Sequence, residues 1–189
     1  MSLTAFLKTQ IEDTYRATDG LMALCDDAAL GWKPATGDNW MTTGQLLFHL
    51  QMACGACVQG FVTGDWSALM PPDATQSGAE GGAECAADGD CGADAGLPTA
   101  DKLPTSKSVA DSRTALAKDK AVALGMLAEA GEERLATQMV GAPWNPQERP
   151  LASQVGDCIQ HLASHKSQLF YYLKLQGKPV NTMHLWGMA

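Results

Sequence analysis

The feature that most constrains this chain is a helical spacing of apolar residues, which recurs in four long segments. From Leu3 to Cys25, for example, apolar residues follow one another at intervals of three or four, the spacing of one buried helix face. The same spacing predicts helices over residues 3–27, 42–63, 108–135 and 151–176. No segment is typical of a strand. The pattern therefore favours an all-α fold, a four-helix bundle.

Signals at the helix ends support these bounds. Thr42 and Gln45 stand in the relation of a capping box, which specifies the start of the second helix. Gly177 and Pro179 supply a stop after the last helix. The first and third connections are short, whereas the second is long and permits a crossover. We therefore expect one domain over residues 1–189 with an up-down-down-up order of helices.

The long connection has a composition of its own. Residues 71–100 are rich in Ala, Gly and acidic residues and contain no Lys or Arg. Such a segment buries too little apolar surface to offset its ordering entropy. We therefore interpret residues 66–105 as a flexible acidic crossover insertion. Its two cysteines, Cys85 and Cys91, are interpreted as loop thiols, with reversible disulfide formation as an open alternative.

Charge and length exclude several classes of function. The formal net charge of −8 argues against binding to a phosphate backbone, which requires clustered Lys and Arg. No apolar run is assigned as a membrane span, and the N-terminus lacks the pattern of a signal peptide. We therefore expect a cytoplasmic protein without nucleic-acid or membrane partners. In a reducing cytosol the helical cysteines are interpreted mainly as small core residues: Cys25, Cys54, Cys57 and Cys158.

Three histidines carry the clearest chemical signal. His161 and His165 are four residues apart on one predicted helix, so their rings project about 40° apart on the same face. His49 is the other histidine in a helical pattern, and it lies at the margin of a buried face. Three neutral imidazoles leave coordination positions open, as in catalytic metal sites. The sequence therefore predicts a metal site at His49, His161 and His165.

Three further residues allow both a functional and a structural interpretation, whereas a fourth histidine does not. Asp157 precedes His161 by four positions and could accept its ring N–H, although a solvated surface carboxylate is an equal alternative. Gln168 and Tyr172 could line the open side of the metal, or could simply belong to the core. His184, in the C-terminal tail, is interpreted as having no functional role.

Two segments resemble the DinB/YfiT-like family of four-helix proteins. The segment Asp38-Asn-Trp-Met-Thr-Thr-Gly-Gln-Leu-Leu-Phe-His49-Leu50 resembles the entry of the family's second helix. The segment His161-Leu-Ala-Ser-His165-Lys-Ser-Gln168-Leu-Phe-Tyr-Tyr172-Leu-Lys-Leu-Gln-Gly177 is similar to its closing helix. The resemblance covers most of the chain outside residues 65–106. It implies a three-histidine site at His49, His161 and His165, usually occupied by zinc or nickel.

The resemblance carries less information about the reaction. The family includes transferases that use low-molecular-weight thiols such as bacillithiol or mycothiol, besides many members with no known activity. The first hypothesis is therefore a metal-dependent thiol transferase or hydrolase that acts on a small molecule. The second is a non-catalytic, stress-related interaction module that binds metal. Dimerisation of two copies is compatible with either hypothesis.

Overall fold

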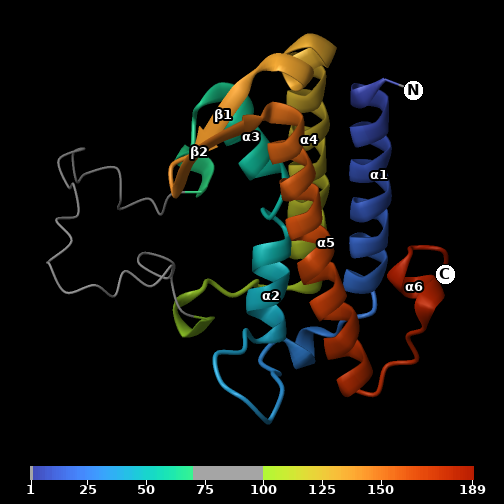
Figure 1. Ribbon diagram of the computed structural model, residues 1–189. Coiled ribbons are helices and arrows are strands. Elements are labelled where there is room, and N and C mark those ends of the chain that lie inside the picture. Colours follow the sequence, from blue (N-terminus) through green and yellow to red (C-terminus); the bar gives the residue numbers. More distant parts are fainter. Residues whose placement is uncertain (1, 70–99) are drawn as a thin grey trace, which may run out of the picture.

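A computed structural model describes residues 2–69 and 100–189, and these form a mostly helical bundle with five main helices and a small hairpin (Figure 1). The main helices are α1 (Leu3–Met22), α2 (Thr43–Leu50), α3 (Gly55–Thr63), α4 (Val109–Thr137) and α5 (Leu151–Leu175). The smaller elements are β1 (Met139–Ala142), β2 (Asn145–Pro150), α6 (Thr182–Leu185) and single 3₁₀ turns at Asp27–Ala29, Ser67–Leu69 and Ala100–Lys102. Most of the predicted crossover, with Cys85 and Cys91, lies outside the described residues.

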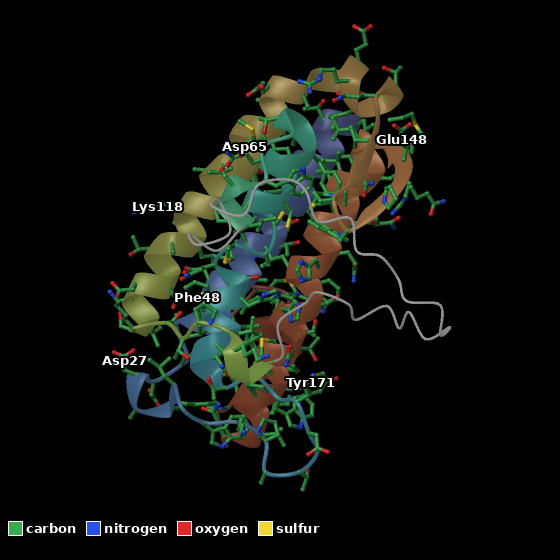
Figure 2. The ribbon with its side chains drawn as sticks, turned by 90° about the vertical axis from the view of Figure 1, so that its left-hand side faces the viewer. Asp27, Phe48, Asp65, Lys118, Glu148 and Tyr171 are labelled. Atoms are coloured by element: carbon green, nitrogen blue, oxygen red, sulfur yellow. The ribbon has the colours of Figure 1, made fainter. Side chains whose placement is uncertain are left out.

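The core lies where the apolar faces of the helices meet. Helix α1 packs against α4 and α5, and α3 packs against the same two helices from another side. Seen from the side, α2 and α3 lie between α4 and α5, while Lys118 projects from the outer face of α4 (Figure 2). Fully buried side chains such as Ile11, Leu50 and Leu162 each contribute roughly 1.5–3 kcal/mol to folding. The up-down-down-up order stays a prediction.

The start of α2 confirms the predicted capping box. The Thr42 hydroxyl accepts a hydrogen bond from the Gln45 backbone N–H at 3.2 Å, and the Gln45 side chain accepts one from the Thr42 N–H at 2.8 Å. The Gln45 amide also donates to the carbonyl groups of Ala100 and Leu103. One side chain therefore begins the helix and attaches it to the chain that returns after the long connection.

The prediction of one continuous helix over 42–63 is wrong, because the chain breaks between α2 and α3. The side chain of Asp119, from α4, accepts hydrogen bonds from the backbone N–H groups of Gly55 and Ala56, both at 2.9 Å. Tyr15 of α1 donates to the same carboxylate at 2.5 Å. A Cβ at Gly55 would lie 2.1 Å from the Asp119 carbonyl oxygen. Asp119 therefore caps the start of α3 from another helix.

The expectation that the chain contains no strand is also wrong. Strands β1 and β2 pair antiparallel, with Met139 opposite Pro150 and Ala142 opposite Asn145. Three prolines between residues 143 and 150 suggested a loop, and the exposed strands lack a buried face that would produce an alternating pattern. The hairpin is attached to α5 through hydrogen bonds from the Leu151 N–H to Gln138 and from the Gln154 amide to Val140.

One apolar stretch is long enough to cross a membrane, although the sequence analysis assigned no membrane span. Thr43–Thr63 has the length and the mean hydropathy, 1.3, of a membrane-spanning helix. However, 61% of its most apolar window is buried inside the bundle, and the break between α2 and α3 interrupts it. A core helix of a soluble protein passes the same test.

Candidate metal centre

The fold brings the three predicted histidines together. His49 lies in the last turn of α2, and His161 and His165 lie one turn apart on α5, which packs against α2. Each ring offers one nitrogen such that the three nitrogens lie within 4.8 Å of one another. The centroid of the His49 ring is 5.0 Å from that of His161 and 4.3 Å from that of His165. This group could hold a metal ion.

The closest pair of ring nitrogens fits one shared cation. His49 Nε2 lies 3.0 Å from His161 Nε2. Two nitrogens that each bind one zinc ion at 2.0–2.1 Å with tetrahedral angles are about 3.3 Å apart, so only a small adjustment separates this arrangement from a metal site. The donor set, three imidazole nitrogens, suits zinc, nickel, copper or iron more than magnesium or calcium.

The ring of His161 is oriented by a backbone carbonyl. His161 Nδ1 lies 3.1 Å from the carbonyl oxygen of Ala53, in the break between α2 and α3. A carbonyl oxygen can only accept, so Nδ1 carries the hydrogen and Nε2 keeps its lone pair for a metal. Asp157 instead pairs with Arg149, and its side chain is 58% exposed, which agrees with the alternative interpretation of this residue as a surface carboxylate.

The ring of His165 is oriented by a chain of hydrogen bonds through Gln168 and Tyr172. Tyr172 donates its only hydroxyl hydrogen to the Met41 carbonyl at 2.8 Å, so its oxygen is free to accept from the Gln168 amide N–H at 3.2 Å. The Gln168 carbonyl oxygen must then face His165 Nδ1, 3.0 Å away. His165 Nδ1 therefore carries the hydrogen, and its Nε2 is available as a ligand.

Gln168 and Tyr172 thus lie behind the His165 ring. The sequence analysis had left open whether they line the open side of the metal or simply belong to the core. Tyr172 is itself held by aromatic contacts, because its ring packs edge-on against Trp32 at 5.2 Å and Trp40 at 6.2 Å between centroids. Both tryptophans come from the segment between α1 and α2. This segment therefore supports the hydrogen-bond chain that orients His165.

Burial lowers the pKa of two of the three histidines and so favours their neutral form. Desolvation, with the nearby rings of His165 and His161, lowers the pKa of His49 to about 4. Desolvation also lowers the pKa of His165, although the Gln168 hydrogen bond opposes this change. Both rings are consequently neutral at pH 7 in the absence of metal, which is the form that binds a metal ion.

Sequence reasoning missed a thiol beside this group. The Cys57 side chain, on α3, contacts both Cys158 and His161 of α5. The hydrogen bond with Cys158 and the His161 ring lower the pKa of Cys57 to about 6, against the opposing effect of burial. The sequence analysis interpreted Cys57 as a small core residue, whereas the structure leaves it partly accessible to solvent. The three-residue spacing of Cys158 and His161 was the available signal for a shared helix face.

His184 takes no part in the site. It lies on α6, where its ring nitrogen bonds to Asn181 and completes a cap of that short helix. The structural interpretation of this residue is therefore sufficient.

Comparison with known proteins identifies the family of this chain. No curated protein and no solved structure matches the chain significantly. The DinB superfamily matches residues 10–169, a range that includes the three histidines of the site and Gln168. Because this match covers most of the chain, and the mostly helical bundle agrees with it, the protein belongs to the DinB superfamily.

Proposed function

We propose that His49, His161 and His165 hold one divalent metal ion, zinc or nickel, and that the protein is a metal-dependent transferase acting on a small molecule. The observation that carries the proposal is the orientation of the two α5 histidines. The Ala53 carbonyl and the Gln168 amide each engage one Nδ1, which leaves both Nε2 lone pairs for a shared cation.

The ligand set favours a site with open coordination positions. Within residues 2–69 and 100–189, the metal-ligand group contains three histidines and no acidic or cysteine side chain. Three protein ligands with a fourth position open to solvent or substrate are typical of catalytic zinc, whereas structural zinc is bound by four.

The chemistry proposed is transfer of a thiol to an electrophile. A divalent ion in this position would lower the pKa of a coordinated thiol or water and so produce a nucleophile at neutral pH. Hydrolysis normally also needs a general base, and no carboxylate belongs to the described ligand group. A thiol needs less help in losing its proton, so we favour thiol transfer over hydrolysis. The proposed substrate is a low-molecular-weight thiol with a small electrophile.

The roles of the residues follow from their contacts. The three histidines bind the metal ion, while Gln168 and Tyr172 keep the His165 ring in the orientation that binds it.

We also propose that the protein acts in the cytoplasm. The four cysteines among the described residues are free thiols, which suits a reducing compartment.

The first experiment is elemental analysis of protein purified without a metal-affinity step. We expect about one equivalent of zinc or nickel per chain in the wild type and none in His161→Ala. His184→Ala is the matched control, because this histidine lies on α6, outside the group of three histidines, and its loss should leave the metal content unchanged. Wild-type protein that stays metal-free after reconstitution would overturn the proposal.

The second experiment separates catalysis from metal binding alone. Loaded wild-type protein and His161→Ala are incubated with bacillithiol or mycothiol and a small alkyl halide, and thioether formation is measured. We expect thioether and halide in equal amounts from the wild type only. A loaded protein that shows no turnover with either thiol would favour the alternative, a non-catalytic interaction module that binds metal.

A further inference from the structure

Cys57 and Cys158 form a contact between two helices that the metal site does not use. Cys57 lies in α3 and Cys158 in α5, and these helices pack against each other (Figure 2). The two thiols are in side-chain contact, and neither is part of a disulfide. They are 101 positions apart in the sequence (158 minus 57), so the fold alone creates this pair.

The two thiols differ in exposure. Cys57 is partly accessible to solvent, whereas Cys158 is only 4% exposed. A small oxidant can therefore reach Cys57 first, because Cys158 is buried in the core. An accessible thiol with a second thiol in contact is the arrangement in which oxidation ends in a reversible disulfide and does not continue to irreversible acids.

The neighbouring Cys54 is engaged elsewhere. Its side chain contacts Tyr15 of α1 and is fully buried. Cys54 precedes α3 as its cap residue, so the Cys54-Gly-Ala-Cys57 stretch crosses from the break into the helix. These contacts therefore indicate that Cys57 pairs with Cys158 of α5 and not with Cys54.

We propose that Cys57 and Cys158 are a redox-active dithiol that reduces a small hydroperoxide and closes to a disulfide between α3 and α5. The Cys57 sulfur attacks the peroxide, the O–O bond breaks, and water or an alcohol leaves while Cys57 becomes a sulfenic acid. The Cys158 sulfur then attacks the Cys57 sulfur, the S–O bond breaks and water leaves. The two thiols lose two electrons and two protons, which the peroxide gains.

The test is native oxidation of metal-free, full-length protein with hydrogen peroxide, followed by thiol titration. Cys85→Ser and Cys91→Ser are introduced first, so that every thiol counted belongs to the described residues. We expect the loss of two thiols per chain, and their full recovery with dithiothreitol. Metal-free protein makes the outcome independent of the proposed transferase.

Variants are needed to identify the two cysteines that form the disulfide. No Lys or Arg lies between Lys33 and Lys102, so trypsin leaves Cys54 and Cys57 in one peptide. In Cys57→Ser no thiol should be lost. In Cys158→Ser, Cys57 should stop at the sulfenic acid and be trapped by dimedone. Cys54→Ala and Cys25→Ser are matched controls, buried cysteines whose loss should leave the two-thiol oxidation intact.

Three results would overturn the proposal: no oxidation of the folded protein, a disulfide that persists in Cys158→Ser, or one that disappears in Cys54→Ala. The last two would assign the bond to Cys54 and Cys57. None of these results bears on metal binding by the three histidines, which elemental analysis measures separately.

Discussion

At the scale of single residues, the candidate metal centre depends on which nitrogen of each ring carries hydrogen. A histidine binds metal through the nitrogen opposite its hydrogen-bonded one. For His161 that hydrogen-bond partner is the Ala53 carbonyl, and for His165 it is Gln168. The affinity of the site is therefore set partly by groups that never contact the ion.

Replacing Gln168 with leucine should weaken zinc binding about 10- to 100-fold, because His165 loses the acceptor that orients its ring. The dissociation constant is measured by competition with a chromophoric chelator. Gln160→Leu is the control, since Gln160 is exposed on the same helix and its side chain bonds to Ser164, away from the three histidines. An affinity equal to wild type in Gln168→Leu would contradict the assigned role.

The metal-free protein should become less stable as the pH falls from 6.5 towards 4. The pKa of His49 is about 4 in the folded protein and ordinarily 6.5, so the unfolded chain binds the proton more readily in this interval. Stability is therefore complete above pH 6.5 and is lost on acidification. Urea unfolding at several pH values measures this dependence.

A His49→Gln variant tests the origin of this pH dependence. It should show a smaller loss of unfolding free energy between pH 6.5 and 4, whereas His184→Gln, on α6 and outside the group of three histidines, should keep the wild-type slope. Identical slopes in wild type and His49→Gln would assign the effect to other groups.

At the scale of elements, the break between α2 and α3 connects the core to the site. Asp119 and Tyr15, on α4 and α1, end the helical run by engaging the backbone N–H groups at the start of α3. The break leaves the Ala53 carbonyl free for His161. A buried cap contributed by one helix thus positions a metal ligand on another.

Asp119→Ala should lower the free energy of unfolding by roughly 3 kcal/mol, because it leaves two N–H groups and the Tyr15 hydroxyl without their charged acceptor. Glu129→Ala, an exposed acidic residue of the same helix, should change stability by less than about 0.5 kcal/mol. Denaturant unfolding compares the two. Equal effects would show that Asp119 is not a specific cap.

At the scale of the whole molecule, the site exists only when α2 lies beside α5. His49 and His161 are separated by 112 positions, and their rings meet through tertiary packing. A ligand that binds only this folded arrangement stabilises the entire chain by mass action.

Zinc should therefore raise the melting temperature of the metal-free protein, with a stabilisation of about 2.7 kcal/mol when free zinc is 100 times its dissociation constant. Scanning calorimetry with and without zinc measures the shift. His161→Ala should show no comparable shift, and His184→Ala should respond as the wild type does. An equal shift in His161→Ala would place zinc elsewhere in the chain.

The sequence by itself determined the features whose causes lie within a few residues. The three-to-four spacing of apolar residues predicted the helical bundle, and the relation of Thr42 to Gln45 predicted the start of α2. The four-residue spacing of His161 and His165 likewise ensured that both rings share a face of α5. These patterns depend on helix geometry, which is the same wherever the helix packs.

Only the tertiary structure decided which groups meet across helices. Helical spacing cannot show that Asp119 interrupts the run from 42 to 63, that Ala53 and not Asp157 orients His161, or that Cys57 faces Cys158. Each of these contacts joins residues far apart in the chain. Their partners depend on which faces turn toward each other when the core forms, and that is a property of the assembled bundle.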